Sequence, residues 1–576
     1  MLNGEKAGCK ELLAKRILAA IISSIILQFF FTTCVILITN LSIVHPLSWL
    51  RDTWGIITRF ETWSYYLALA VIIFLQGAIC SRNYLNAPPC LNSRFAILCN
   101  IFMPRNLVMG SLYMVIGSTL VWLHLSLEDG RYGALTRSCD IKEGSCLVEE
   151  HYFLLLGGMW AGIYFFLKTN SFSFHYLQFP IIPQSKFSQV KRGIEVALPM
   201  VMLSAVWPTL YYLGIYFIFG AYLRNAALTT LFLHLENEPL SRITGLLSLS
   251  LIFHMWLYMS LFALSMNVMH IIFQAYLTQW IPFEVARTAV FSNETLNVTL
   301  PEALSMDKIP IIQHLGYLDL VTLSQKEKHR RAMLFTLSQP GGHPYNWNCI
   351  VDKCTEMIKS FTKELDAACL GRQDHVQVLA PSTLSKLQPM ERSHAYHMRN
   401  LVSPKIVSPI PVERTVCKQS EQFILQYFQN LKQRLVNYLL SKPLIFYIFG
   451  EQTDSKVKHV LVKAQQIIWA SDALSSIAVV SLMEDPYGIV QKDLPALISV
   501  LLALKHSLDK LQKINMQLVR KPQTDDRLIR QVITSLRSAV KRSVYRITSS
   551  FKDYILDLGL EPATLEQLQG FLSYRE

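Results

Sequence analysis

Cysteines are the residues of this 576-residue sequence whose type and spacing most directly suggest chemistry. Cys139 and Cys146 flank a short polar stretch and could form a disulfide bond in an oxidising compartment, although two free loop thiols are the alternative. Cys349 and Cys354, with His343, offer three possible zinc ligands. Because a fourth ligand and a paired CxxC spacing are missing, the sequence does not favour a zinc site, and we expect no bound metal.

Motifs typical of catalysis are absent from the sequence. The sequence contains no P-loop, no GxSxG nucleophile elbow, no HExxH helix and no GxGxxG turn. Gly341 and Gly342 lie in LSQPGGHPYNW, but no Lys-Ser/Thr pair follows them, and Pro340 and Pro344 indicate a rigid turn. We interpret this segment as a structural loop packed by Trp347, and we expect neither a catalytic residue nor a cofactor.

Two serines could be phosphorylated. Residues 371–418 lose helical periodicity and become polar and punctuated by proline, which predicts a flexible linker. Ser403 and Ser408 each precede a proline there, a context that suits proline-directed kinases, although Ser-Pro pairs are also common by chance. Each phosphate would add about −1.5 to −2 charges to a basic linker. We therefore expect phosphorylation to tune contacts with partner proteins in mitosis.

A basic amphipathic helix is predicted near the C-terminus, over residues 528–556. It carries seven Lys or Arg and no acid between residues 526 and 553. Its apolar residues form one stripe at helical spacing: Leu528, Val532, Leu536, Val540, Val544, Ile547 and Phe551. In one interpretation the stripe packs in a helical bundle and the cations are its solvated face. In the other, which can hold together with the first, anionic headgroups or an acidic partner surface contact Arg537, Lys541, Arg542 and Arg546. Replacing these four by glutamine should then leave folding nearly intact.

The composition places these residues in a protein with two unlike halves. The whole chain is 51% hydrophobic and 16% charged, with a formal net charge of +13, and so few charges are unusual for a soluble globular protein. Residues 1–273 hold 31 charged residues, whereas residues 274–576 hold 64. The first half therefore has the composition of a membrane protein, and the second half that of a soluble one.

Six stretches of the first half are long and apolar enough to cross a bilayer as helices. None contains Asp, Glu, Lys or Arg, and the fourth is the shortest. The fifth contains Pro199 and Pro208, which should kink it unless neighbouring helices satisfy the freed carbonyls. The spans are expected at residues 17–38, 63–80, 107–125, 152–167, 196–222 and 246–273.

Positive residues indicate the orientation of these spans. The N-terminal tail and the second and fourth loops hold 11 Lys or Arg, against seven in the first, third and fifth loops. Because Lys and Arg gather on the cytosolic side, both termini are expected there. The third loop, residues 126–151, carries six acids together with Cys139 and Cys146. It is expected in the lumen, where a disulfide bond can persist.

The second half is expected to be helical as well. A helix is predicted over residues 310–325, and the following KEKHRR is interpreted as a solvated helix end rather than a nuclear-import signal. Toward the C-terminus we expect helices over residues 456–482, 494–518 and 528–556, with EDPYG as the turn between the first two.

The predicted fold is thus an all-α polytopic membrane protein with six transmembrane helices followed by a cytosolic α-helical domain. The predicted domains are a cytosolic tail (1–16), a transmembrane domain (17–273), a helical and loop region (274–370), a flexible linker (371–418) and a C-terminal helical domain (419–576).

Six segments, in chain order, resemble one known family. They are HPLSWL (45–50), FPII (179–182), LSQPGGHPYNW (337–347), IWASDALS (468–475), EDPYGIVQKDLPAL (484–497) and VYRITSSF (544–551). Together they resemble the six-span transmembrane nucleoporin of the nuclear division cycle (Ndc) family over nearly the whole chain. The PGGHP block with Asn346 and Trp347 is the most specific part. One departure is that vertebrate members have a longer Ser/Pro-rich linker than residues 371–418 provide.

The resemblance implies an integral protein of the nuclear pore membrane that anchors scaffold nucleoporins and is needed for pore insertion. It also implies its partners: the WD-repeat nucleoporin aladin, the amphipathic-helix linker nucleoporins of the inner ring and the lipids of the nuclear envelope, with no direct nucleic acid contact. The residues alone leave a transporter or lipid-handling protein and a membrane-bound enzyme as alternatives. Charge-free spans disfavour transport, because substrate paths usually need ionisable groups, and the missing catalytic motifs disfavour an enzyme.

Overall fold

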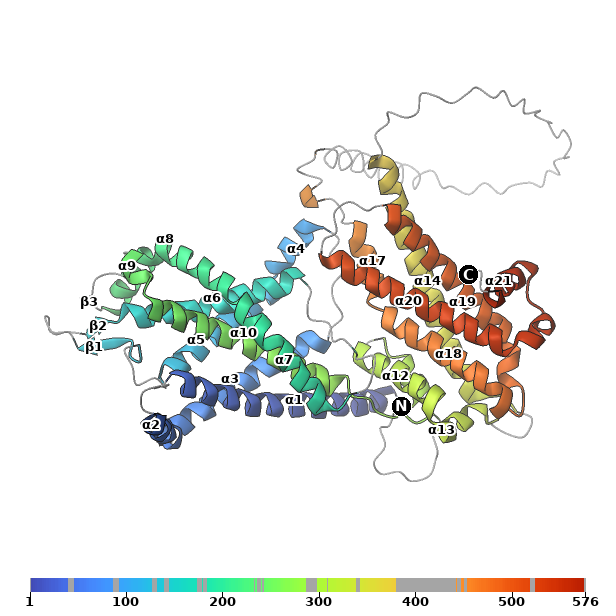
Figure 1. Ribbon diagram of the computed structural model, residues 1–576, viewed down its shortest axis with the longest axis horizontal. Coiled ribbons are helices and arrows are strands. Elements are labelled where there is room, and N and C mark those ends of the chain that lie inside the picture. Colours follow the sequence, from blue (N-terminus) through green and yellow to red (C-terminus); the bar gives the residue numbers. More distant parts are fainter. Residues whose placement is uncertain are drawn as a thin grey trace, which may run out of the picture.

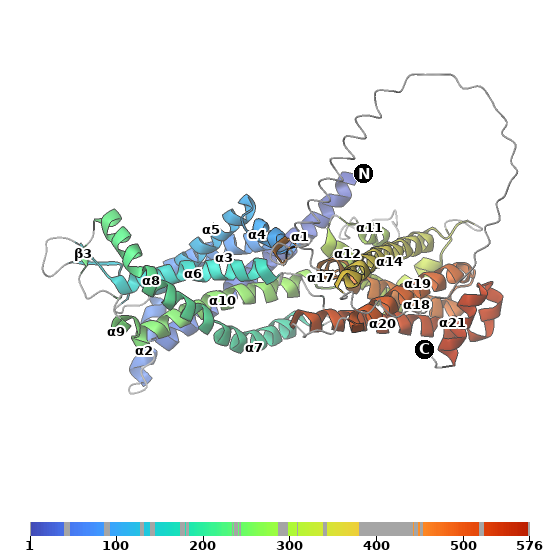
Figure 2. The same ribbon diagram turned by 90° about the horizontal axis from the view of Figure 1, so that it is seen from above.

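The computed structural model describes residues 2–39, 46–85, 93–126, 132–138, 145–172, 179, 184–232, 234–235, 240, 243–285, 298–307, 309–337, 342–379, 442, 447–449, 453–517 and 524–573. These residues form two parts that lie end to end along the long axis of the molecule, as both views show (Figures 1 and 2). We call the part that ends with α10 the membrane half, and the part from α11 onward the C-terminal module.

Long apolar helices build the membrane half. They are α1 (Leu2–Thr39), α3 (Phe60–Leu85), α5 (Pro104–Ser126), α6 (Glu149–Phe172), α7 (Lys186–Ser204), α8 (Val206–Leu231) and α10 (Leu249–Leu277). The shorter helices of this half are α2 (Pro46–Thr58), α4 (Arg94–Ile101) and α9 (Ile243–Leu246). Among the described residues, six of the 7 candidate membrane spans lie in this half. Each overlaps one of the six predicted spans.

The fifth predicted span is two helices. Ala205 separates α7 from α8, and Pro208 lies in the first turn of α8, whereas Pro199 lies inside α7. Proline lacks the N–H that would bond a carbonyl one turn earlier. Indole groups of neighbouring helices bond carbonyls beside the break: Trp256 Nε1 donates to a carbonyl of α7 at 3.1 Å, and Trp160 Nε1 to the carbonyl of Pro208 at 3.0 Å. The kink predicted at Pro208 is confirmed, whereas α7 continues through Pro199, and polar backbone near the break is satisfied as a membrane interior requires.

A small sheet closes the end of the membrane half farthest from the C-terminal module (Figure 1). β1 (Thr136–Ser138) pairs antiparallel with β2 (Ser145–Leu147), and β2 pairs parallel with β3 (His234–Leu235). The sheet therefore joins the third loop to the fifth, two loops predicted to lie on the same side of the membrane. Apart from these short strands and one isolated bridge, the described elements are helical, as predicted.

The C-terminal module is a helical bundle. Its elements are α11 (Leu300–Leu304), α12 (Pro310–Lys326), α13 (Lys328–Ala332), η1 (Met333–Phe335), α14 (Tyr345–Leu379), α17 (Thr453–Leu461), α18 (Ala464–Glu484), α19 (Ile489–Gln517), α20 (Thr524–Ser550), η2 (Lys552–Leu558) and α21 (Pro562–Leu572). By length and composition α18 is a seventh candidate span, but its apolar window is 72% buried inside the protein. It is therefore the central helix of the bundle.

Several predicted boundaries differ from the observed ones. Helix α1 begins at Leu2, so the predicted tail (1–16) continues the first span; buried Cys9 packs there against Met306. Helix α14 runs to Leu379, past the predicted start of the linker. The helix predicted over residues 456–482 is divided into α17 and α18, and α20 ends at Ser550, earlier than predicted. Apolar periodicity does not mark these ends, because packing against distant segments sets them.

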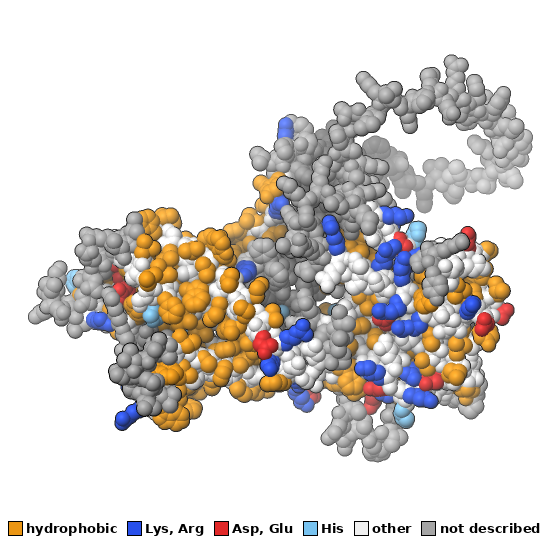
Figure 3. Space-filling view, in the orientation of Figure 1, with side chains coloured by type: hydrophobic (Ala, Val, Ile, Leu, Met, Phe, Trp, Pro, Cys, Tyr) orange, Lys and Arg blue, Asp and Glu red, His pale blue; other side chains and the backbone are white. Residues whose placement is uncertain are grey.

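The two parts expose different side chains. The membrane half is covered by apolar side chains, whereas Lys, Arg, Asp and Glu are interspersed over the C-terminal module (Figure 3). Large exposed apolar residues of the membrane half include Ile26, Phe30, Leu67, Leu203 and Ile218. A continuous apolar surface of this kind suits contact with lipid rather than water.

Candidate functional site

A cluster of buried polar groups fixes the chain where it leaves the sixth span. We call Trp280, Phe283, Asp319 and Arg330 the Asp319 cluster. The side chain of Asp319, on α12, is fully buried. Its carboxylate accepts hydrogen bonds from Trp280 Nε1 at 3.0 Å, from the backbone N–H of Phe283 at 3.0 Å, and from Arg330 Nη1 and Nη2 at 3.0 and 2.6 Å. These bonds use the accepting capacity of the carboxylate. They hold the segment that follows α10 against α12.

Arg331 makes a second ion pair, between segments far apart in the sequence. Its Nε and Nη2 donate to the two carboxylate oxygens of Glu484 at 2.8 and 2.9 Å. The hydrogen bonds from Arg331 hold the pKa of Glu484 below its usual value. The interpretation of KEKHRR as a solvated helix end is therefore wrong for Arg330 and Arg331. Arg331 pairs with Glu484, which is far away in the sequence, whereas Arg330 pairs with Asp319 of α12 and with Glu327 of the same run, each at 2.6 Å.

Aromatic contacts join the membrane half to the C-terminal module. The ring of Phe179, before the fifth span, stacks on His314 of α12 with centroids 4.8 Å apart, and its centroid lies 5.6 Å from that of Trp469 on α18. Burial lowers the pKa of His314, which favours the neutral ring in this stack. On α4, the Arg94 guanidinium lies 3.6 Å from the centroid of the Tyr447 ring. Two of the segments that carry the family resemblance, FPII and IWASDALS, thus meet at this junction.

Two further segments of the resemblance meet across α14 and α19. Trp347 is fully buried, and its Nε1 donates to Asp493 Oδ2 at 2.8 Å. Trp347 lies in the first turn of α14, so it packs a helix rather than a loop. Gly342, His343 and Pro344 of the PGGHP block and the end of the EDPYG turn line one pocket of about 580 Å³. We call it the motif pocket; its lining includes Gly342, His343, Pro344, Tyr487, Gly488 and Lys492.

The EDPYG turn has the geometry that its sequence predicts. Asp485 Oδ1 accepts the N–H of Tyr487 at 3.1 Å, and Asp485 Oδ2 accepts the N–H of Val490 at 3.0 Å. Gly488 has φ of +64°, a left-handed conformation that glycine adopts without strain. The predicted turn between two helices is confirmed, and it presents Tyr487 to the motif pocket.

The possible zinc ligands do not converge. Among the described residues, no group of three His, Cys, Asp or Glu side chains could hold a metal ion. Cys354 is fully buried, and burial raises the pKa of its thiol to about 12. Because zinc binds the thiolate, this cysteine is poorly suited to metal binding.

The basic helix is α20, and its apolar stripe is buried. Leu536, Val540, Val544, Ile547 and Phe551 are almost completely shielded from solvent. The bundle interpretation of the stripe is thus confirmed for these residues.

Two of the four cations of α20 pair with acids of neighbouring helices. Arg537 pairs with Asp509 of α19, and Arg542 pairs with Asp472 of α18 at 3.2 Å. Arg546 Nη1 donates to Ser476 Oγ at 2.8 Å. The helix itself holds no acid over this stretch, and the two pairing acids, Asp509 and Asp472, lie on α19 and α18. Among the four cations, Lys541 and Arg546 have no ion pair within the described part of the chain.

These contacts change the expected effect of removing the four cations. We now expect the quadruple change Arg537→Gln, Lys541→Gln, Arg542→Gln and Arg546→Gln to lower the free energy of unfolding by roughly 1 to 3 kcal/mol. The single change Lys541→Gln should stay within about 0.5 kcal/mol of wild type. Denaturant titration of the full-length protein in detergent measures both. Equal stability of the two variants would show that the interhelical pairs contribute nothing.

The disulfide bond predicted in the third loop is described only in part. Cys146, in β2, is disulfide-bonded, and the other cysteines of the described part are not in disulfide bonds. Cys139 lies outside the described residues, directly after Ser138, which pairs with Ser145. The pairing of Cys139 with Cys146 therefore stays a prediction. Ser403 and Ser408 also lie outside the described residues.

We expect peptide mapping without reduction to recover one peptide pair linked through Cys139 and Cys146. The short loop that the bond would close corresponds to a chain-entropy gain of roughly 2 to 3 kcal/mol at most. Alkylation of both thiols without prior reduction would refute the pairing.

Two features of the membrane half were not predicted from the sequence. Glu149 Oε1 accepts hydrogen bonds from Arg224 Nη1 at 3.1 Å and from the Tyr216 hydroxyl at 3.0 Å, and its Oε2 accepts the N–H of Leu240 at 3.0 Å. This buried pair joins α6 to α8 at the end that carries the sheet. The only sequence signal for this pair was that Glu149 and Arg224 carry opposite charges and lie just outside two predicted spans.

The second feature is a close approach of two helices at glycines. A Cβ on Gly158 would lie 2.6 Å from the carbonyl oxygen of Gly117, and a Cβ on Gly162 would lie 2.9 Å from Met114 Cα. Gly158 and Gly162 have the GxxxG spacing that lets helix backbones pack closely in membranes. That spacing was visible in the sequence.

Six spans joined through buried polar groups to a large helical module define a polytopic helical membrane protein. The chain belongs to the Ndc1 nucleoporin family, since the family described as "Nucleoporin protein Ndc1-Nup" matches residues 11–569. It is therefore a transmembrane component of the nuclear pore complex and a structural protein rather than an enzyme. The resemblance seen in the sequence is confirmed.

Relatives in distant animals align over nearly their whole length. "Nucleoporin NDC1" of Homo sapiens is 26% identical over 660 residues, covering 98% of this chain and 97% of the relative. "Nucleoporin NDC1" of Xenopus laevis is 27% identical, covering 99% of each chain. "Nucleoporin Ndc1" of Drosophila melanogaster is 27% identical over 583 residues, covering 98% of each chain. The human alignment exceeds the 576 residues of this chain, so it contains insertions.

Proposed function

We propose that this protein anchors the scaffold of the nuclear pore complex in the nuclear envelope and is needed for pore assembly and insertion. The observation that carries the proposal is the Asp319 cluster. It fixes the segment after the sixth span to α12 through buried, charge-assisted hydrogen bonds. A load applied to the C-terminal module is thereby transmitted to the membrane half without a flexible joint at that point.

The proposed partners are aladin, the amphipathic-helix linker nucleoporins of the inner ring and the lipids of the nuclear envelope, as the family resemblance implies. The motif pocket is our proposed docking site for a partner nucleoporin. It lies on the C-terminal module, combines a basic side chain, Lys492, with the exposed ring of Tyr487, and is lined by residues of two segments that carry the family resemblance. The outer face of α20 around Lys541 is the proposed second contact, with an acidic partner surface or anionic headgroups.

The proposed orientation places both termini on the cytosolic and pore side. The N-terminus of α1 and the C-terminal module lie toward the same end of the membrane half, and the sheet lies at the other (Figure 1). This arrangement supports an even number of crossings, and the excess of Lys and Arg supports the assignment of sides.

Phosphorylation of Ser403 or Ser408 is the proposed mitotic control of partner contacts; phosphopeptide analysis that finds both serines unmodified in mitotic cells would contradict it.

A C-terminally tagged chain tests the proposal. We expect a punctate nuclear-rim signal in cells, and digestion of the tag when protease is added to sealed envelope vesicles. A plasma-membrane or diffuse reticular signal would contradict the proposed location at nuclear pores, and protection of the tag from protease would contradict the proposed orientation.

A further inference from the structure

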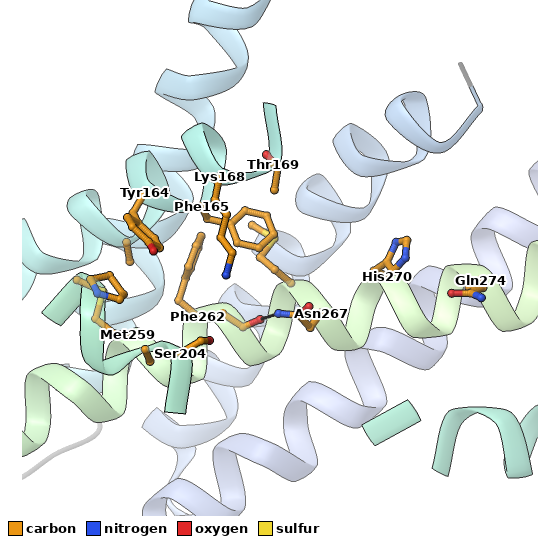
Figure 4. A pocket seen from close by; sticks show the side chains of 15 residues that line it. Tyr164, Phe165, Lys168, Thr169, Ser204, Met259, Phe262, Asn267, His270 and Gln274 are labelled. Atoms are coloured by element: carbon orange, nitrogen blue, oxygen red, sulfur yellow. Dashed lines mark hydrogen bonds between the residues drawn. The ribbon is translucent and has the colours of Figure 1, made fainter. Parts of the chain in front are cut away.

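A cavity of about 440 Å³ lies within the membrane half, at the break between α7 and α8. It is bounded by α6, by Ser204, Ala205 and Pro208 at the break, and by α10 (Figure 4). The volume lies within the usual range for small-molecule sites. The break itself explains why space is left there, because Pro208 diverts the chain and the flanking Ala161, Ala205 and Ala263 have small side chains.

The lining of this cavity changes from polar to apolar along the helices. Lys168 and Thr169 lie near the end of α6, and His270 and Gln274 lie toward the end of α10 that meets the C-terminal module. Nearer the middle of the membrane half the lining becomes aromatic and aliphatic, with Tyr164, Phe165, Pro208, Met259 and Phe262. The cavity is therefore amphipathic, with its polar end at one surface of the membrane half.

Lys168 is placed to meet an anion at that surface. It is the second-last residue of the candidate span Glu149–Thr169, so its depth corresponds to the headgroup level. Figure 4 shows its side chain reaching from α6 toward α10, beside Phe165 and Phe262. The cavity lining contains one lysine and no carboxylate. Within the described part of the chain, Lys168 has no ion pair.

We propose that this cavity binds an anionic glycerophospholipid of the surrounding membrane. The lipid phosphate contacts the Lys168 amine, and the polar side chains beside Lys168 contact the rest of the headgroup. An acyl chain packs along Pro208, Met259 and Phe262. A soluble anion would gain the contact with Lys168 but not the apolar surface. A zwitterionic lipid such as phosphatidylcholine has a cationic group that cancels its phosphate charge, whereas an anionic lipid keeps a net negative charge to pair with Lys168. The inference concerns the membrane half alone and does not depend on which nucleoporins bind.

The test is lipid retention by the full-length protein in nanodiscs that contain equal amounts of phosphatidylserine and phosphatidylcholine, measured by native mass spectrometry after release into detergent. We expect retention of phosphatidylserine over phosphatidylcholine. Lys168→Gln should weaken phosphatidylserine retention about tenfold, the effect of losing one charge-assisted contact. Lys191→Gln is the matched control: Lys191, on α7, pairs with Glu195 and does not line the cavity. It should retain phosphatidylserine as wild type does.

A second variant keeps the test decisive should Lys168→Gln fail to fold. Ala263→Leu adds volume inside the cavity from α10 and should reduce retention of phosphatidylserine while elution from a sizing column stays unchanged. Water-soluble glycerophosphoserine, added in excess, should not displace the retained lipid; displacement would assign the site to the headgroup alone and overturn the proposed acyl contact. Equal retention of the two lipids, or wild-type retention by both variants, would overturn the proposal.

Discussion

Replacing Gly162 by leucine is expected to prevent stable assembly of the membrane half. A Cβ at this position meets the carbonyl of Tyr113 and lies 2.9 Å from Met114 Cα. These are backbone atoms of α5, so no side-chain rotation can relieve the collision, and α5 must move away from α6 as a whole. We expect the free energy of unfolding to fall by at least about 3 kcal/mol, the upper end for overpacked cores. We also expect the protein in detergent to lose its monodisperse peak in size-exclusion chromatography.

Gly214 provides the matched control on another membrane helix. No atom outside its own helix neighbourhood lies within 4 Å of a Cβ built there. Gly214→Leu should therefore leave the elution profile and cellular abundance close to wild type. If Gly162→Leu behaved as Gly214→Leu does, α5 and α6 would not pack at the distance described.

Arg330→Gln is expected to destabilise the joint between the sixth span and the C-terminal module by about 3–5 kcal/mol, the cost of leaving a buried charge without its partner. The change would leave the fully buried Asp319 carboxylate without its two bonds to the guanidinium. It would also remove the bond from Arg330 Nη2 to the carbonyl of Phe283 at 2.6 Å. Denaturant titration of the full-length protein in detergent measures the loss.

Lys353→Gln is the control for a charge change of the same kind. Lys353 and Glu356 form an exposed pair at 3.0 Å, with side-chain exposures of 43% and 72%. Exposed pairs contribute little, so this variant should stay within about 1 kcal/mol of wild type. Equal effects of Arg330→Gln and Lys353→Gln would show that the Asp319 cluster does not hold the joint.

The sequence predicted the parts of the fold that rest on local pattern. Hydropathy located all six spans, because each must present about 20 apolar residues to the bilayer. The EDPYG turn followed from its own residues, since Asp485 and Gly488 act within a few positions. The buried stripe of α20 followed from helical spacing.

The site was less predictable, because several of its charges are neutralised by residues far away in the chain. Arg331 meets Glu484, and Arg542 meets Asp472. A basic run reads as exposed when its acids lie on other helices, so the composition of KEKHRR and of α20 was misleading. These ion pairs form only when the helices of the bundle pack together, and the spacing of residues in a single sequence does not show which helices become neighbours.

Acute depletion tests the central claim, that this chain anchors the pore scaffold in the membrane. The endogenous protein is fused to a degradation tag, and pores per area of nuclear envelope are counted after depletion during pore assembly. We predict that pore density and envelope-bound scaffold nucleoporins both fall, and that the untagged wild-type chain restores them. Unchanged pore density with scaffold nucleoporins still at the envelope would contradict the account.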